Sequence, residues 1–388
     1  MALAVTDLDR MWRARALARE GAGRTWTNPM VGAVVVADGR EVGAGFHRRC
    51  GEAHAESAAI EAAGSAARGA TLYVNLEPCA HHGRTPPCVE TIAAAGIARV
   101  VIPALDPDPR VRGRGVAWLR ERGVKVDVGC DAAAAILDNH GYYHDRLGLA
   151  PTITLKMAVS ADGMVARGPG RRDPVTGDAA RADAHRLRAV QDAIVVGVET
   201  AHIDRPVLDC RLVEGGVERE PVPVVFDTSL RLPADNVWAR SGREFIVVAG
   251  EGADHARARA LEARGGSVLF CPAGPGGVRV ERAVELLAGR GLKRILVEGG
   301  ARLFRSFVAA EVWDALWLYR SSGVFGAGAV PLSAGAAEPA GIAVDEVSVG
   351  GDVRRRFVRA PSWERLRSRL MLRTESTEGG EGDVHRNH

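Results

Sequence analysis

A histidine, a glutamate and two cysteines near the start of the chain have the types and the order of a catalytic metal site. His54 and Glu56 flank one alanine, and Cys79, preceded by proline, is followed by Cys88. One imidazole and two thiolates leave a fourth tetrahedral position open for water, as in catalytic rather than structural zinc sites. Zinc lowers the pKa of such a water to about 7, and a glutamate that is not a ligand can then move its protons. The pattern predicts a zinc-dependent deaminase in which His54, Cys79 and Cys88 bind the metal and Glu56 is catalytic.

Taken one at a time, these residues have ordinary alternative explanations. A histidine on a helix surface and two buried apolar thiols would need no metal. The ordered set, with each cysteine at a junction between a strand and a helix, favours the metal site. The eight residues 80–87 separate the cysteines, where the usual deaminase signature has two. We therefore expect a loop beside the metal that holds substrate.

The elements that must position these residues alternate between strand-like and helix-like stretches. In the first half, the expected strands are 31–36, 70–76, 99–103 and 124–128, and the expected helices are 55–63, 88–95 and 115–121. This alternation is typical of an α/β domain in which helices cover a sheet. His54 and Glu56 then lie at the start of one helix, and Cys88 opens another.

A second alternating series begins after Pro151. The expected strands are 153–157, 193–198, 222–227, 245–249, 267–271, 295–297 and 315–319, and the expected helices are 179–190, 280–288 and 301–310. Residues 145–151 read as a connector, so we predict domains at 1–146 and 151–372. The glycine-rich, charged stretch 374–388 is predicted to be a disordered tail.

The composition is that of a soluble globular protein. Of 388 residues, 46% are hydrophobic and 26% are charged, and the formal net charge is only +3. That small excess, without basic blocks, argues against a nucleic-acid partner. No stretch resembles a signal peptide or a membrane span, so we expect a cytoplasmic protein whose cysteines stay reduced unless a metal binds them.

The loop between the two cysteines resembles a known family. Residues 77–88, Glu-Pro-Cys-Ala-His-His-Gly-Arg-Thr-Pro-Pro-Cys, look like the hallmark of the bifunctional riboflavin-biosynthesis deaminase/reductase family. Residues 28–32 and 51–56 resemble two further motifs, and 106–109 a fourth, with Asp108 where asparagine is usual. The resemblance implies an α/β chain with a cytidine-deaminase-like three-layer domain followed by a dihydrofolate-reductase-like domain.

The same resemblance implies a small phosphorylated pyrimidine as substrate. That compound is 2,5-diamino-6-(5-phosphoribosylamino)pyrimidin-4-one, deaminated at ring carbon 2. Asn28 would bind a polar edge or a ribose hydroxyl, and His47, His81, Arg84 and Thr85 are candidates for the phosphate. A solvated loop arginine is the alternative for Arg84, and His81 could instead pack against the loop.

The second half has weaker signals that gain force from their order. Residues 297–300 form a strand followed by a glycine turn ahead of a helix, a setting suited to phosphate. They do not form the Gly-x-Gly-x-x-Gly fingerprint of a Rossmann domain. Ordered matches from 155–158 to 298–300 resemble the reductase domain of the same family. This implies NADPH as cofactor and hydride transfer to C1′ of the ribosyl imine.

Site residues of the reductase are carried over by position from the resemblance. The substrate residues would be Lys156, Arg188, Leu208, Arg211 and Glu298. The cofactor residues would be Ala158, Thr176, Thr200, Asp204, Thr228, Ser229, Gly299 and Gly300. A surface ion pair or a turn cap is the alternative role for Lys156 and Asp204.

Two departures from the family pattern bear on the reductase. Residues 172–177 lack a tryptophan and two serines, and Glu199 stands where a glycine usually precedes Thr200. We expect the Glu199 carboxylate to lie near cofactor phosphates and to weaken NADPH binding by repulsion. One alternative is therefore a deaminase whose silent second domain serves as a dimerisation module, and a nucleic-acid deaminase is a less favoured one. We also expect a homodimer or a higher homo-oligomer.

Overall fold

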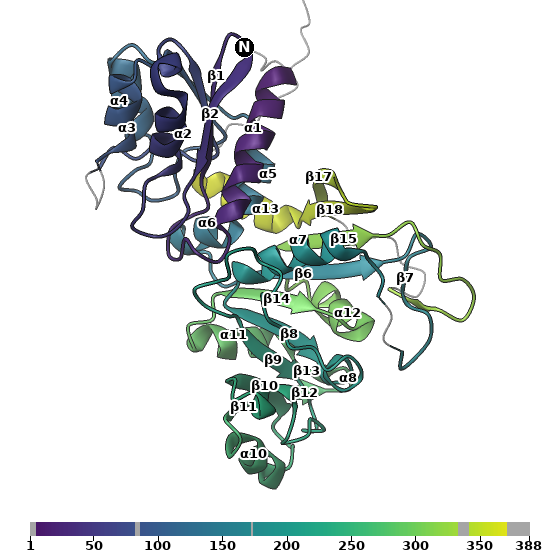
Figure 1. Ribbon diagram of the computed structural model, residues 1–388. Helices are drawn as coiled ribbons and strands as arrows, with labels where there is room; N and C mark the ends of the chain where they lie inside the picture. The colour runs from purple at the N-terminus through teal and green to yellow at the C-terminus, as the bar shows by residue number, and fades with distance from the viewer. Residues whose placement is uncertain (1–4, 82–85, 172–173, 333–340, 371–388) are drawn as a thin grey trace, which may run out of the picture.

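The computed structural model describes residues 5–81, 86–171, 174–332 and 341–370, which form two α/β units stacked end to end (Figure 1). The sheet of the first unit has the order β2-β1-β3-β4-β5. Its strands are β1 (Gly32–Ala37), β2 (Arg40–Phe46), β3 (Thr71–Val74), β4 (Arg99–Ile102) and β5 (Lys125–Val128). The strands β3, β4 and β5 are parallel, whereas β1 is antiparallel to both of its neighbours. The predicted tail 374–388 lies outside the described residues.

Helices cover both faces of this first sheet. One face carries α2 (Ala55–Ala63), α3 (Cys88–Ala94) and α4 (Arg114–Glu121), and the other carries α1 (Val5–Ala18). Short 3₁₀ helices follow α1 and α2 at Arg19–Gly21 and Gly64–Ala67. A Cβ on Gly43 of β2 would lie 2.3 Å from the carbonyl oxygen of Ala59, so α2 rests directly on the strand backbone. This close approach fixes the helix that begins beside His54.

The second unit is built on a sheet with the order β11-β10-β9-β8-β14-β6-β15-β18-β17. Its strands are β6 (Thr152–Val159), β8 (Ala193–Gly197), β9 (Val222–Phe226), β10 (Phe245–Gly250), β11 (Gly266–Cys271), β14 (Arg294–Glu298), β15 (Ala315–Arg320), β17 (Ile342–Val349) and β18 (Asp352–Val358). The strands from β11 to β15 in that order are parallel, and β18 and β17 are antiparallel additions. Small antiparallel pairs join β12 (Ala273–Gly274) to β13 (Gly277–Val278) and β7 (Met164–Ala166) to β16 (Val330–Pro331).

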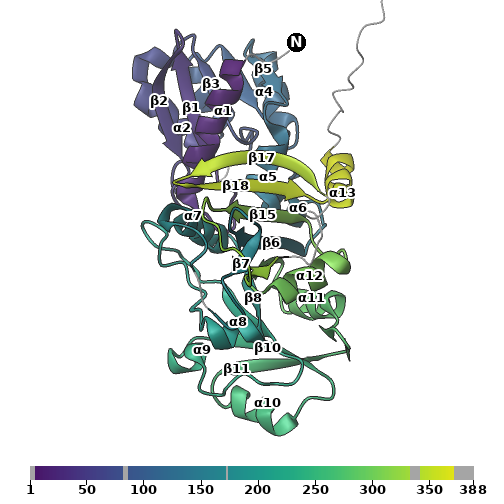
Figure 2. The ribbon, with the colours of Figure 1, turned by 90° about the vertical axis from the view of Figure 1, so that its right-hand side faces the viewer.

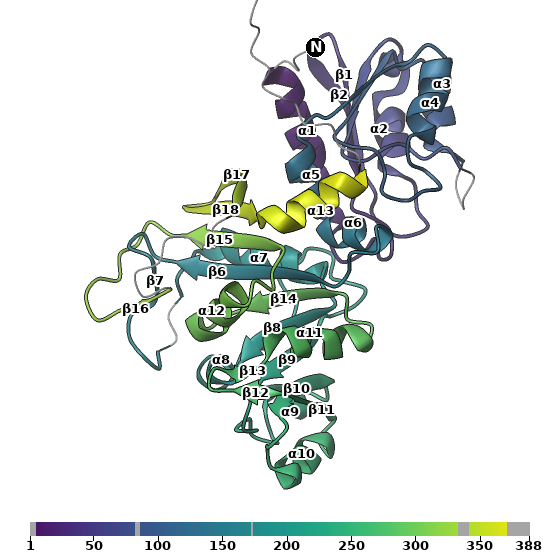
Figure 3. The ribbon, with the colours of Figure 1, turned by 180° about the vertical axis from the view of Figure 1, so that it is seen from behind.

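The two faces of this sheet bury separate cores. Against one face pack α7 (Asp178–Ala189), α8 (Val198–Ile203), α9 (Val237–Arg240) and α10 (His255–Glu262). Against the other pack α11 (Val280–Gly289) and α12 (Ala301–Ala309), seen from behind in Figure 3. Because β8, β9 and β14 are parallel, the turns that follow them lie at one edge of the sheet. Ligands of open α/β sheets bind at this carboxyl edge.

Buried ion pairs join the two units through α5 (Ala132–Asp138) and β18. The carboxylate of Asp138 accepts hydrogen bonds from Arg15 at 2.7 Å, Arg19 at 2.7 Å and Arg356 at 2.6 Å. Burial alone would raise the pKa of Asp138, but the three guanidinium charges hold it well below its usual range. Figure 2 shows β17 and β18 lying between the two units. Strand β18 of the second unit is thereby tied to helices of the first unit.

The last described helix returns to the first unit. After α6 (His140–Arg146) the chain enters the second sheet, yet α13 (Ala360–Leu370) packs back beside α5 and α6 (Figure 3). Leu366 and Leu370 share a buried cluster with Leu76, Ile136 and Tyr143. The side chain of Arg112 also donates to the carbonyl of Arg369 at 2.7 Å. The first unit is therefore completed by residues from the far end of the sequence.

The expected elements and the observed ones agree over most of both units. The helix expected at 55–63 is observed with those bounds, and the expected strands of both sheets are present within a few residues. The elements that were not expected from the sequence include strands β2, β17 and β18 and helices α5, α6, α8, α9, α10 and α13. Among the described residues, no helix combines the length and the apolar character that crossing a bilayer requires.

Candidate metal centre and cofactor groove

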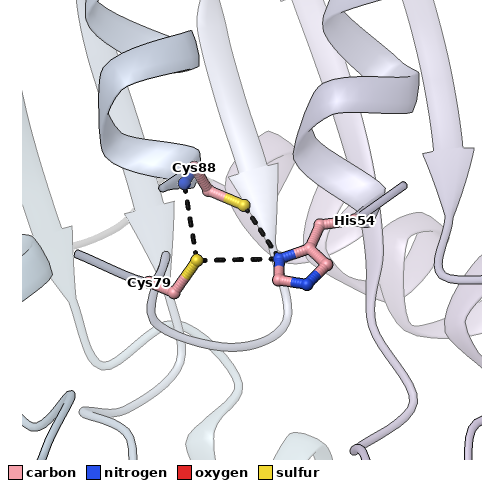
Figure 4. A group of neighbouring side chains, drawn as sticks. All are labelled: His54, Cys79 and Cys88. Carbon is pink, nitrogen blue, oxygen red and sulfur yellow. Dashed lines mark hydrogen bonds between the residues drawn. The ribbon is translucent and has the colours of Figure 1, made fainter. Parts of the chain in front are cut away.

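The three residues predicted to bind metal converge in the first unit. One ligand atom from each of His54, Cys79 and Cys88 lies within 4.8 Å of the others (Figure 4). Nδ1 of His54 lies 3.1 Å from Sγ of Cys88 and 3.6 Å from Sγ of Cys79. The three side chains come from separate segments of the chain: the residue before α2, the loop after β3 and the first residue of α3.

The local backbone holds this group together. The backbone N–H of Cys88 donates to Sγ of Cys79 at 3.4 Å, and Val89 donates to the Cys79 carbonyl at 3.3 Å. The hydrogen bond with Cys88 lowers the pKa of the Cys79 thiol to about 4, whereas the pKa of Cys88 is raised. Cys79 is therefore the more readily ionised of the two thiols, and thiolate is the form that binds a metal. An imidazole with two thiols is a donor set that fits zinc.

Glu56 lies in the first turn of α2 beside this group. Its side chain is buried, and burial, followed by the nearby Cys79 charge, raises its pKa. A carboxyl group with a raised pKa takes up a proton more readily than an ordinary carboxylate, as a proton carrier must. The sequence-predicted proton carrier is therefore adjacent to the predicted metal ligands.

A cavity of about 370 Å³ is lined by two of the predicted metal ligands, His54 and Cys79, and by Glu56. Asn28, His47 and His81, which were predicted to contact substrate, all line it. Nδ2 of Asn28 lies 3.2 Å from Nε2 of His47, whose Nδ1 lies 3.1 Å from the carbonyl of Ala53. Because a carbonyl can only accept, Nδ1 of His47 carries the proton and Nε2 accepts from Asn28. Burial lowers the pKa of His47, which favours this neutral form. Arg84 and Thr85 lie outside the described residues.

Three further residues of this cavity were missed by sequence reasoning. The buried carboxylate of Glu77 accepts backbone hydrogen bonds from Asp106, Gly113, Gly115 and Val116 at 2.9 to 3.2 Å. Tyr142 donates to Oδ1 of Asp106 at 3.1 Å, and burial raises the pKa of Asp106 to about 7. Glu77 and Asp106 lie within motifs that resemble those of the family, so their positions could have indicated a role. Tyr142 lies in none of these motifs, and nothing in the sequence indicated that it contacts Asp106.

In the second unit, a buried ion pair organises the predicted substrate residues. Arg188 donates to both carboxylate oxygens of Glu298, at 2.8 and 2.7 Å. Burial opposes ionisation of Glu298, yet the charge and hydrogen bonds of Arg188 hold its pKa at about 2. Lys156 pairs in register with Glu298 across β6 and β14 and is partly buried, and this burial lowers its pKa. Glu298 opposes that lowering.

Leu208 and Arg211 lie on the loop beside this pair. Leu208 is buried with a φ of 55°, and Arg188 donates to the carbonyl of Asp209 at 3.1 Å. Arg211 pairs with the Asp209 side chain and is more than half exposed. His185, one turn before Arg188, is also buried there, and burial lowers its pKa to about 4. Sequence reasoning assigned His185 no role.

An open groove of about 370 Å³ lies at the carboxyl edge of the second sheet. Four of the residues predicted to bind the cofactor line this groove: Thr200, Thr228, Ser229 and Gly300. Gly299 and Gly300 have φ values of 83° and 74°, and a Cβ on Gly299 would lie 3.0 Å from Thr200. Only glycine combines that backbone with that proximity.

The remaining predicted cofactor residues lie apart from the lining of this groove. They are Ala158 in β6, Thr176 before α7, Asp204 at the end of α8, and Gly299, which is next to the groove residue Gly300. The backbone N–H of Asp204 donates to the carbonyl of Thr200 at 2.9 Å. Asp204 therefore adjoins a groove residue through the backbone of α8.

Glu199 also lines the groove, and its carboxylate is paired. Nη1 of Arg231 donates to Oε1 of Glu199 at 2.7 Å, and both side chains are about half exposed. The sequence placed Glu199 near the cofactor path but gave no sign of this partner, which follows the next strand of the sheet.

Comparison with known proteins agrees with both halves of this description. Residues 6–104 match the family model of the cytidine and deoxycytidylate deaminase zinc-binding region, and residues 151–349 match that of the RibD C-terminal domain. The riboflavin biosynthesis protein RibD of Bacillus amyloliquefaciens is 41% identical over 305 residues, covering 78% of this chain and 81% of the relative. The chain belongs to the RibD family.

Solved structures of RibD proteins share the fold of this chain. RibD of Acinetobacter baumannii has 30% sequence identity and a TM-score of 0.63, covering 91% of this chain and 98% of that one. The diaminohydroxyphosphoribosylaminopyrimidine deaminase/5-amino-6-(5-phosphoribosylamino)uracil reductase of Thermotoga maritima has 32% identity and a TM-score of 0.63, covering 92% and 99%. The expected fold class, a deaminase-like domain followed by a reductase domain, is confirmed.

As a RibD family member, this chain is a bifunctional enzyme of riboflavin biosynthesis. It combines a zinc-dependent deaminase with an NADPH-dependent reductase, as expected from the sequence. The comparisons do not favour a silent second domain, because the family model of the RibD C-terminal domain matches most of that half.

Proposed function

We propose that the first unit deaminates 2,5-diamino-6-(5-phosphoribosylamino)pyrimidin-4-one at ring carbon 2. The observation that supports this most is the convergence of His54, Cys79 and Cys88 beside buried Glu56 at the base of a cavity. Held by these three residues, zinc supplies the Lewis acidity that makes water nucleophilic at neutral pH. Glu56 accepts the proton that the attacking water loses and delivers it toward the ring nitrogen and the departing ammonia.

The other cavity residues bind and orient the substrate in this proposal. Asn28 is held by His47 and presents its amide to a polar edge of the ring or a ribose hydroxyl. His47, His81, Arg84 and Thr85 are proposed to surround the phosphate, the first two from the described cavity wall. A phosphate far from ring carbon 2 contributes mainly uniform binding, which lowers KM.

The second unit is proposed to reduce the ribosyl side chain of the deaminated product to a ribityl chain. NADPH supplies the hydride for C1′ of the ribosyl imine. Lys156, Arg188, Leu208, Arg211 and Glu298 hold the substrate. The groove residues Thr200, Thr228, Ser229 and Gly300 hold the cofactor together with Gly299, Ala158, Thr176 and Asp204. The fixed Arg188–Glu298 pair supports this role, since it needs no rearrangement when substrate arrives.

The organisation of the chain completes the proposal. We place the deaminase domain at 1–146 and the reductase domain at 151–372. We further propose a homodimer or a higher homo-oligomer that works in the cytoplasm on a small molecule. Size-exclusion chromatography with light scattering tests the oligomer, and a monomeric mass would contradict it.

One experiment tests both activities in the same sample. The purified protein is given the diaminopyrimidine phosphate, and ammonia release and NADPH oxidation are followed with and without NADPH. We expect ammonia in both cases and NADPH oxidation only after ammonia has appeared. Protein stripped of zinc by a chelator should release no ammonia, yet it should still oxidise NADPH when given the deaminated product.

Each result bears on a different part of the proposal. Ammonia release by stripped protein would contradict the role of the three ligands. Absence of NADPH oxidation with the deaminated product would contradict the proposed reductase substrate and leave the deaminase assignment standing.

A further inference from the structure

The charges of the cofactor groove are concentrated at two points. Arg302, in the first turn of α12, reaches across to the carbonyl of Gly276 at 3.4 Å. Arg231, on the loop after β9, is paired with Glu199. Within the described lining of the groove, Glu199 is the only acidic residue. The one acidic side chain of this lining is thus paired with one of the two lining arginines, in a groove that is proposed to bind a polyanionic dinucleotide.

The order of the strands shows which end of a dinucleotide would meet Arg231. Lys156 and Glu298, the proposed substrate residues, lie on β6 and β14, and Arg231 follows β9. In the sheet order β9-β8-β14-β6, the end of β9 lies two strand spacings from β14 and three from β6, roughly 10 to 14 Å. A cofactor whose nicotinamide meets the substrate must run along the strand ends past Gly300. Its adenosine end then arrives at the corner formed by Arg231.

The chemistry of that corner suits a phosphate ester. Thr228 and Ser229 line it with hydroxyl groups, although Thr228 Oγ1 already accepts from the backbone of Val278 at 3.2 Å. The Arg231 guanidinium offers a fork of donors that matches phosphate oxygens. NADPH carries a phosphate on its adenosine ribose where NADH carries a hydroxyl. The corner therefore meets the group by which these two cofactors differ.

We propose that Arg231 selects NADPH over NADH by binding the adenosine 2′-phosphate. Glu199 is the partner of Arg231 when no cofactor is bound, and the 2′-phosphate replaces Glu199 in that pair. This inference rests on the proposed reductase function and names the residues that set its cofactor preference. Glu199 is thus a competitor for Arg231, which refines the expectation that it repels the cofactor directly.

The exposure of the ion pair makes this exchange favourable. The side chains of Arg231 and Glu199 are 48% and 61% exposed, and ion pairs so exposed contribute little to stability. Nε of Arg231 also lies 3.9 Å from the buried carboxylate of Asp227, which keeps the arginine at the groove when Glu199 is released. A phosphate dianion with two hydrogen bonds binds a guanidinium more strongly than one exposed carboxylate does.

The test compares cofactor binding between variants of the full chain. Dissociation constants for NADPH and NADH are measured by fluorescence titration for wild type, R231A and E199Q. R231A should weaken NADPH binding by ~10-fold or more and change NADH binding by less than about 2-fold. E199Q should tighten NADPH binding a few-fold and leave NADH binding unchanged, and this gain should shrink as salt is raised.

A matched control separates this effect from a general loss of surface charge. Arg240 forms a similarly exposed pair with Asp235, at 3.7 Å, on α9 outside the groove lining. R240A should bind both cofactors as wild type does, and an unchanged thermal unfolding curve of the full chain shows that each variant is folded. Equal weakening of NADPH and NADH in R231A, or unchanged NADPH binding, would overturn the inference alone. If wild type binds neither cofactor, the proposed reductase function fails with it.

Discussion

The two sites of this enzyme are organised in opposite ways. The deaminase site is a closed cluster in which three ligand atoms lie within 4.8 Å and the proton carrier is buried beside them. The cofactor groove is open, and its charges are satisfied by pairs between neighbouring loops, such as Glu199 with Arg231. A cluster built around one metal fails as a whole when one member changes. A groove of separate polar contacts responds to each change by degrees.

The largest effect should come from Glu56→Gln. Glutamine keeps the shape of the side chain but cannot carry the proton, so deamination should fall by at least ~10²-fold. Zinc content, measured by metal analysis, and NADPH oxidation with the deaminated product should both stay at wild-type levels.

Glu61→Gln is the matched control for that variant, because Glu61 lies on the same helix and is exposed. It should leave both activities intact. Substantial deamination by Glu56→Gln would remove Glu56 from the mechanism and break the contrast between a cooperative and a graded site.

A smaller effect is expected from Glu298→Gln in the reductase. Loss of the charged bond to Arg188 should lower reductase kcat/KM by about 10-fold. Glu298 also opposes the lowering of the Lys156 pKa by burial. Without that carboxylate the pKa of Lys156 falls further, so Lys156 loses its proton at a lower pH. The alkaline limb of the reductase pH profile should therefore move to lower pH.

Glu281→Gln, on the exposed side of α11, serves as control and should leave the profile in place. If the limb of Glu298→Gln stays where it is in wild type, Lys156 is not the group that titrates. Deamination should be unchanged in both variants, because Glu298 lies in the second unit.

The smallest effect should come from Asp106→Asn in the deaminase cavity. Asp106 has a pKa of about 7 and is faced by Tyr142, Glu77 and Asp108. Above that pH its charge adds to the negative charge of the cavity and opposes an anionic substrate. The wild-type KM for the phosphorylated substrate should therefore rise a few-fold from pH 6 to pH 8. A change of this size is what the repulsion energy of two partly screened charges would produce. In Asp106→Asn this rise should be absent.

The exposed Glu121→Gln variant on α4 is the control and should keep the wild-type rise in KM. An identical rise in Asp106→Asn would show that another group titrates. A few-fold change in KM at Asp106 would sharpen the contrast between the two kinds of site. It would show that residues of the cavity wall contribute by degrees, even in the deaminase, whereas the metal cluster fails as a whole.

The contrast also explains what could be predicted from the sequence. His54, Glu56 and Cys88 lie at the starts of α2 and α3, so local patterns were sufficient to place them. Glu199 could be placed near the cofactor path, but its partner lies 32 residues further along the chain. A pair of that kind becomes visible only when parallel strands bring two loops to one edge.

The missed elements have a similar physical cause. Strand β18 contains Arg354 and Arg356. Arginines at alternate positions are typical of an exposed strand, but these two side chains are buried. Their carboxylate partners are Asp183 for the first, and Asp138 and Asp345 for the second. Because Asp183 and Asp138 belong to helices far away in the chain, no local pattern of hydrophobicity could reveal the strand. Strand β2 was missed for another reason: Gly43 and Gly45 interrupt its pattern so that α2 can approach.

The return of α13 to the first unit sets the order in which the newborn chain can mature. A ribosome delivers the deaminase half first, but Leu366 and Leu370 emerge only after the whole reductase sheet has been synthesised. Until then Leu76, Ile136 and Tyr143 lack part of their apolar cover. The first unit therefore lacks its last helix until nearly the whole chain has been made, and dividing the chain between the two units at residue 151 would leave the deaminase without that layer.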